Sequence, residues 1–247
     1  MTIRTEKELQ GMQEAGRVVR ETLAAMRRAV RPGVSTAELD EVAYGVFERH
    51  GARSAPKLVY QFPGHTCISV NDEIVHGIPG ARLLADGDLV KLDVTVEKDG
   101  FMADSACTVG VGKVAPESLR LIRCARAAFQ EAMKVARAGS RANEVGRVIE
   151  RSAHRQGFST VRELCGHGIG RTIHEPPTVP NFYDPTCRDL LREGMVVAIE
   201  PMVAAGSNRS VLDKDGWTVR TQDGSMAAHY EHTVVITRGR PLFLTAA

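Results

Sequence analysis

The strongest constraint on the fold is an internal repeat, because the two halves of the chain present the same signals in the same order. Gly33 interrupts one helical pattern, and Gly139 interrupts another 106 positions later. Residues 83–93 then align without a gap over residues 190–200, at an offset of 107. Helix–turn–helix units can resemble one another by chance, but the gapless alignment makes chance the less favoured explanation. The repeat therefore predicts two pseudosymmetric halves that share one central site.

Each half is expected to open with a pair of amphipathic helices, because apolar residues recur there at helical spacing. Ser35 and Glu38 form a capping box at the start of the second helix. The expected elements are helices over residues 6–30, 35–50, 116–136 and 143–157, a loop-rich stretch over 54–66, a strand at 67–70, and a late hairpin with strands over 217–221 and 227–236.

The most informative local pattern is a strand pair over residues 91–105, where apolar and polar residues alternate on both sides of a tight turn. A two-residue loop at residues 99–100, or a four-residue loop over 97–100, places Asp93 and Asp104 on the same face, opposite or diagonal to each other. A three-residue loop without a bulge would separate them, so the inference depends on the turn.

Two carboxylates on one face of a strand pair repel unless a cation, a shared proton or water lies between them. A solvated polar face is the alternative explanation. However, apolar neighbours such as Leu92 and Val94 indicate that the hairpin is buried, and burial favours a divalent metal ion.

Three further stretches carry metal-type ligands in unusual settings. His167 stands among three glycines over residues 166–170, Glu200 ends an apolar strand immediately before a proline, and Glu231 interrupts the last strand. A glutamate at a strand end is more often solvated, so each observation alone is weak. Two aspartates, two glutamates and one histidine together are an inventory that suits a pair of divalent ions. The zinc-protease pattern H-E-x-x-H does not occur in the sequence.

Composition excludes several other classes of protein. The net charge is +2 with both signs interspersed, so no basic stripe argues for nucleic acid. No apolar run approaches the ~20 residues that span a bilayer, and the first residues lack the apolar core of a signal peptide. The five cysteines are scattered and never form C-x-x-C, which fits reduced thiols. We expect a soluble, cytoplasmic protein without membrane contact.

These residues resemble type I methionine aminopeptidase along nearly the whole chain. The resemblance rests on Asp93, Asp104, Gly166-His167-Gly168-Ile169-Gly170, His174-Glu175-Pro176, Ile199-Glu200-Pro201-Met202 and Tyr230-Glu231-His232-Thr233. It implies the α+β pita-bread fold, in which a central antiparallel sheet is covered by two pairs of helices related by a pseudo-twofold repeat. It also implies one catalytic domain over residues 1–247, with halves of about 1–115 and 116–247.

The resemblance implies a role for each site residue and two divalent cations per chain, whether cobalt, manganese, iron or zinc. Asp93 would bind one metal, His167 and Glu200 the other, with Asp104 and Glu231 bridging both. Four carboxylates would then offset the four positive charges of the metal pair. A hydroxide bridging the metals would attack the first peptide bond, with Glu200 as the proton carrier and His76 and His174 as catalytic contacts to the scissile peptide. The implied activity removes the initiator methionine from nascent polypeptides whose second residue is small and uncharged.

The substrate side chain is expected to enter an apolar pocket formed by Phe62, Cys67, His76 and Trp217, because a thioether suits sulfur and aromatic walls. The alternative is that Phe62 and Trp217 are ordinary core residues. The chain departs from the family pattern at Val59, Ile173 and Ser105, where tyrosine, phenylalanine and threonine are usual, and these changes concern the pocket rather than the metal ligands. The expected partners are nascent chains and, in a transient contact, the ribosome. The protein is expected to be a monomer.

Three relatives of similar fold are less compatible with the sequence. Aminopeptidase P and prolidase carry a histidine four residues before the position of His167, where this chain has Glu163, and they usually have an N-terminal domain for which the start of the first helix leaves no room. Type II methionine aminopeptidases carry a helical insertion for which residues 175–196 are too few. A non-catalytic binding module would have lost ligands, and all five are present.

Overall fold

The computed structural model describes residues 1–246, so residue 247 of the expected domain lies outside the described residues. The elements in chain order are α1 (Glu6–Ala29), α2 (Thr36–His50), β1 (Arg53–Ser54), α3 (Ala55–Tyr60), β2 (Cys67–Val70), β3 (Glu73–Val75), β4 (Leu89–Lys98), β5 (Phe101–Gly110), α4 (Pro116–Val135), α5 (Ala142–Arg155), β6 (Ser159–Thr160), β7 (Cys165–Gly168), β8 (Glu175–Pro180), β9 (Val196–Ile199), β10 (Met202–Ala204), β11 (Ser210–Leu212), β12 (Val219–Thr221), β13 (Ala227–His229), β14 (His232–Val235) and β15 (Leu242–Phe243). No helix among these is long and apolar enough to cross a membrane.

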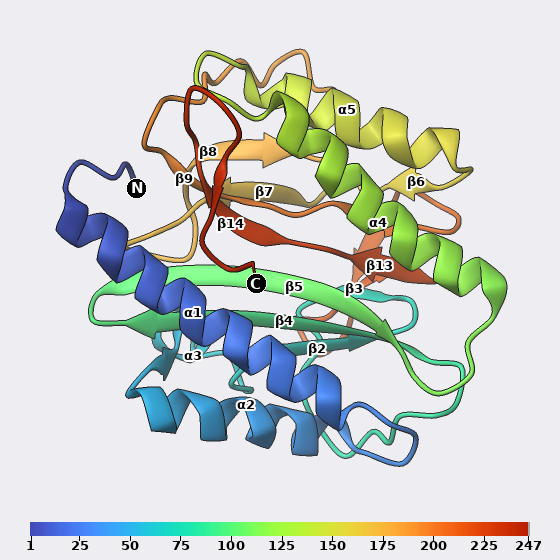
Figure 1. Ribbon diagram of the computed structural model, residues 1–247. Coiled ribbons are helices and arrows are strands. Elements are labelled where there is room, and N and C mark those ends of the chain that lie inside the picture. Colours follow the sequence, from blue (N-terminus) through green and yellow to red (C-terminus); the bar gives the residue numbers. More distant parts are fainter. Residues whose placement is uncertain (247) are drawn as a thin grey trace.

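The four longest helices form two pairs that cover the strands (Figure 1). The pair α1–α2 belongs to the first half, and α1 packs on the long hairpin β4–β5. The pair α4–α5 belongs to the second half and packs on strands that include β8, β10 and β13. Strand pairings within residues 1–246 are antiparallel, in hydrogen-bonded orders that include β1–β4–β2 with β5 beside β4, and β15–β14–β9–β7–β8. This is the α+β arrangement that the sequence predicted.

The two halves meet where β5 runs beside the segment that links β13 to β14. The backbone N–H of Asp104 donates to the hydroxyl of Thr233 (2.9 Å), and that hydroxyl donates to the carbonyl of Asp104 (2.7 Å). The N–H of Glu231 donates to the carbonyl of Ala106 (2.9 Å). These bonds hold the β4–β5 hairpin of the first half against the strands of the second half and fix two acidic residues next to each other.

The repeat is visible in equivalent backbone hydrogen bonds. The N–H of Gly33 donates to the carbonyl of Leu84 (2.8 Å), and the N–H of Gly139 donates to the carbonyl of Leu191 (2.9 Å). Both glycines take a left-handed conformation, with φ of 84° and 91°, that a residue with a Cβ adopts at a cost. Each turn delivers the chain into the second helix of its pair, which begins at Thr36 or Ala142. The two halves therefore share turn geometry as well as sequence pattern.

Two local predictions were wrong. The stretch 54–66 contains the helix α3, because Pro56 lies in its first turn, where the missing N–H is not needed, and the Ser54 hydroxyl accepts a bond from the N–H of Lys57 (3.3 Å). The late hairpin does not form either. Strand β12 pairs with β3 and β11, whereas β13 pairs with β10, and the expected strand over 227–236 breaks between His229 and His232. Both strands found other partners, so no ladder joins β12 to β13 among the described residues.

We expect Gly33→Ala and Gly139→Ala each to lower the free energy of unfolding by about 1–2 kcal/mol, because both positions are open in space but left-handed in φ. The effects should add, since the two turns belong to different halves. Urea unfolding measures this. Gly80→Ala is the matched control, because a Cβ there also meets no atom within 4 Å and its φ is not left-handed. A loss at Gly80 equal to that at the two turns would contradict the argument.

Candidate metal centre

The hairpin β4–β5 places its two aspartates on one face. Its loop has two residues, with Lys98 paired to Phe101, and Asp99 and Gly100 take positive φ of 50° and 82°, as a type I′ turn requires. In this register Thr95 pairs with Asp104, so Asp93 is diagonal to Asp104. The predicted shared face is confirmed. Burial is the main influence on the pKa of the Asp104 carboxyl and raises it, whereas Thr95, a cavity residue that sequence reasoning missed, lowers it.

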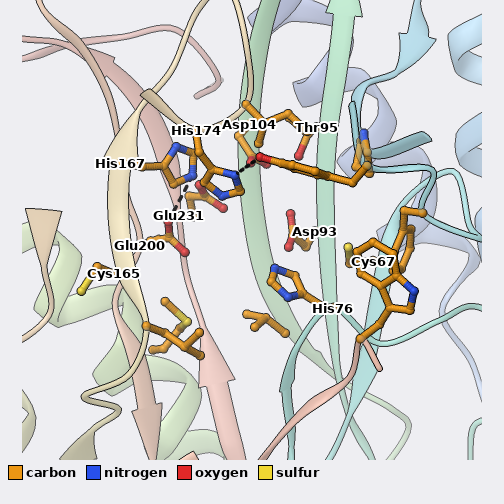
Figure 2. Close-up of a pocket in the computed structure, with 18 residues that line it drawn as sticks. Cys67, His76, Asp93, Thr95, Asp104, Cys165, His167, His174, Glu200 and Glu231 are labelled. Carbon is orange, nitrogen blue, oxygen red and sulfur yellow. Dashed lines mark hydrogen bonds and ion pairs between the residues drawn. The ribbon is translucent and has the colours of Figure 1, made fainter. Parts of the chain in front are cut away.

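The remaining ligand candidates come from the second half. His167 lies in β7, Glu200 follows β9 directly, and Glu231 lies between β13 and β14. Strand β9 is hydrogen-bonded to both β7 and β14, which brings the three residues to one level of the sheet. Figure 2 shows these side chains and the two aspartates converging on one cavity. All five residues selected from the sequence are thus brought together.

The distances within the cluster suit ligands of shared cations. Single ligand atoms of Asp104, His167 and Glu231 lie within 4.8 Å of one another. The Nε2 atom of His167 is 3.4 Å from Oε1 of Glu200. One carboxylate oxygen of Asp104 and one of Glu231 are buried without a hydrogen-bond partner within the described residues. Buried polar atoms without partners are costly, and a divalent ion would satisfy them.

Burial shifts the pKa values of the cluster away from the charged forms. It raises the pKa of Asp93, Glu200 and Glu231 well above their usual range, with repulsion from neighbouring carboxylates adding to the effect. Burial also raises the pKa of Asp104 to about 6. Burial also disfavours the charged form of His167 and lowers its pKa to about 4, and the nearby His174 lowers it further. A neutral imidazole among carboxylates that need a counter-charge is the donor set of a divalent-metal site.

A second histidine, which sequence reasoning missed, belongs to the same cluster. His229 ends β13, and its imidazole forms a group of potential ligands with Glu200 and Glu231. The sequence held one signal for His229, which is its spacing of two residues from Glu231. Residues two apart fall on the same side of an extended chain.

A cavity of about 300 Å³ opens in front of the carboxylates. The four predicted pocket residues Phe62, Cys67, His76 and Trp217 all line it, together with His174 and the five ligand candidates. The rings of Phe62 and Trp217 meet edge to face with centroids 5.2 Å apart. Phe62 and Cys67 are otherwise buried. The pocket is therefore apolar on one side and acidic on the other.

A strained turn directs His76 toward this cavity. His76 has a φ of 58°, and the N–H of the next residue, Gly77, donates to the hydroxyl of Ser69 (3.0 Å). A Cβ on Gly77 would lie 2.4 Å from the carbonyl oxygen of Ile68, so only glycine allows this close approach. Backbone strain of this kind persists where the surrounding structure holds it, commonly at functional sites.

The three departures from the family pattern have different consequences. Ile173 lines the cavity, and Ser105 is buried with its hydroxyl donating to the carbonyl of Glu231 (2.5 Å). Val59 packs against the core of the first half instead of lining the cavity. Its neighbour Tyr60 does line it, with its hydroxyl 2.6 Å from Nδ1 of His174. Tyr60 thus brings a tyrosine hydroxyl to the cavity from the position directly after Val59, where the family usually has its tyrosine.

A family model matches most of the chain. Metallopeptidase family M24 matches residues 10–238. The chain belongs to this family. Within the M24 fold, Glu163 stands on the surface, paired with Arg209 (3.3 Å), and does not line the cavity.

Relatives of this M24 protein cover it from end to end. It is 42% identical to "Methionine aminopeptidase 2" of Bacillus subtilis over 247 residues, 99% of each chain. It is 44% identical to "Methionine aminopeptidase" of Clostridium perfringens over 243 residues, 98% of each chain. The crystal structure of methionine aminopeptidase from Rickettsia prowazekii superposes with a TM-score of 0.95 at 37% identity, covering 100% of both chains. The predicted resemblance and the pita-bread fold are both confirmed.

Proposed function

We propose that this M24 metallopeptidase is a methionine aminopeptidase that removes the initiator methionine from nascent polypeptides whose second residue is small and uncharged. One observation carries the proposal: an acidic, histidine-containing cluster lies directly beside an apolar pocket that is large enough for one side chain. The pocket wall of Phe62, Cys67 and Trp217 suits a thioether, which makes favourable contacts with aromatic rings. End-to-end identity with proteins named methionine aminopeptidase supports the same conclusion.

The proposed cofactor is a pair of divalent cations, from among cobalt, manganese, iron and zinc. Asp93 would hold one ion, His167 and Glu200 the other, and Asp104 and Glu231 both. The unpartnered buried oxygens, one on Asp104 and one on Glu231, support this assignment, since an ion would supply the partner that each of them lacks. Divalent ions, when bound, supply the Lewis acidity that makes water a nucleophile at neutral pH.

The chain's own groups supply binding, orientation and proton transfer. Glu200 lines the cavity beside His167 and carries a proton from water to the leaving amine. His76 and His174 face the cavity, where neutral imidazoles donate hydrogen bonds to the peptide as negative charge develops on its oxygen. Burial lowers the pKa of His76 to about 4 and also lowers the pKa of His174, so both rings are neutral at pH 7.

Tyr60 fixes which nitrogen of His174 carries the proton. Its hydroxyl lies 2.6 Å from Nδ1 of His174, and we assign the hydroxyl as the donor, which places the N–H of the neutral ring on Nε2, free for the substrate. We assign Tyr60 as a positioning residue that compensates for Val59.

The proposed substrate, a nascent polypeptide, indicates where the protein works. It acts in the cytoplasm as a monomer, in transient contact with the ribosome. Its chain forms one catalytic domain with halves of about 1–115 and 116–247.

Assays on peptides test the proposed activity. We expect cleavage of Met-Ala-Ser in the presence of cobalt or manganese and no cleavage of Xaa-Pro peptides. A chelator should abolish cleavage and lower the melting temperature, because metal binds only the folded site. Cleavage of Xaa-Pro peptides but not of Met-Ala-Ser would show that the proposal is wrong, and an unchanged melting temperature would contradict a metal-filled centre.

Tyr60→Phe should reduce kcat by about 3- to 10-fold with little change in KM. Without the hydrogen bond from Tyr60, the His174 ring can also carry its N–H on Nδ1, and in that form it has no N–H on Nε2 for the substrate. The melting temperature should not move, since Tyr60 is 41% exposed. Tyr44→Phe is the matched control, because Tyr44 is 37% exposed and donates to Glu48 (2.7 Å), away from the cavity. Steady-state kinetics measure the effect, and wild-type kcat in Tyr60→Phe would rule out the positioning role.

A further inference from the structure

His229 is a buried imidazole whose hydrogen-bonding capacity the mechanism above does not use. Its side chain is 2% exposed, and neither ring nitrogen makes a hydrogen bond within the described residues. Buried polar groups in native proteins nearly always have partners, so an imidazole in this state needs an explanation.

The backbone holds His229 firmly in place. Its N–H donates to the hydroxyl of Thr108 (2.8 Å), and that hydroxyl donates back to the carbonyl of His229 (2.9 Å). On its other side the residue pairs with Met202 in the strand pair β10–β13. The backbone is thus held between two strands, and the buried ring lies against the acidic cluster.

The ring lies close to one oxygen of each of two glutamates. Its Nε2 atom lies 3.6 Å from Oε2 of Glu200 and 3.6 Å from Oε2 of Glu231. The other oxygen of Glu200, Oε1, is the one that faces His167. Both glutamates line the cavity, whereas His229 does not. His229 therefore lies behind the two carboxylates.

We propose that His229 is a positioning residue of the metal centre, whose Nε2–H is shared by Oε2 of Glu200 and Oε2 of Glu231 and so fixes the orientation in which the two carboxylates meet the ions. This inference rests on the proposed metal centre. At 3.6 Å neither contact is yet a hydrogen bond, and a movement of about half an ångström completes one. Groups that hold metal ligands from behind in this way fix ligand orientation and raise metal affinity.

Three proteins test the proposal: the wild type, His229→Gln, which keeps an N–H donor, and His229→Leu, which has none. The metal-free forms are titrated with Mn²⁺ alone by calorimetry, without substrate. We expect His229→Leu to bind Mn²⁺ about 10- to 100-fold more weakly and His229→Gln to stay within a few-fold of the wild type. His229→Met is a second apolar variant that keeps the test valid if His229→Leu does not fold.

Melting temperatures separate positioning from a merely structural role. Replacing an unpartnered buried imidazole with an apolar side chain should leave the metal-free protein as stable as the wild type or more so, while the rise on adding Mn²⁺ shrinks. Equal Mn²⁺ affinity in wild type and His229→Leu would overturn the role of His229 and leave the proposed function intact. A loss in His229→Gln as large as in His229→Leu would also overturn it, because an N–H donor would then not suffice. Wild-type protein that binds no Mn²⁺ would overturn both.

Discussion

The structure is organised around the burial of four carboxylates at the seam between its halves. Burying even one ionised carboxylate without compensation is unfavourable, and mutual repulsion makes four of them far more so. The raised pKa values of Asp93, Asp104, Glu200 and Glu231 express this cost. Cations held by such a cluster would offset this cost, so stability and function would depend on the same ions.

The pseudosymmetric fold is what brings the carboxylates together. Each half supplies two helices and a set of antiparallel strands, and the hydrogen bonds from β5 to Glu231 and Thr233 join the two sets. Asp93 and Asp104 come from a hairpin of the first half, while Glu200 and Glu231 come from neighbouring strands of the second. Neither half alone holds a complete set. The cavity lies over this seam, with His76 and the aromatic wall on one side and His167 and His174 on the other.

Much of this could be predicted from the sequence, for identifiable reasons. The shared face of Asp93 and Asp104 followed from the two-residue period of a strand and the Asp99–Gly100 turn, which are local properties. The missed features depend on tertiary contacts. Strand β12 pairs with β3 rather than with β13, the role of Tyr60 depends on its distance to His174, and that of His229 depends on which strands pack beside it. For His229, only its spacing from Glu231 was visible in advance.

The proposed metal centre would hold two divalent ions per chain. Anomalous diffraction from crystals of the Mn²⁺-loaded protein tests it most directly, because the signal locates each ion independently of activity. The account predicts two peaks, both in contact with Asp104 and Glu231, one of them beside Asp93 and the other beside His167 and Glu200. A single peak, or two peaks without shared ligands, would contradict it.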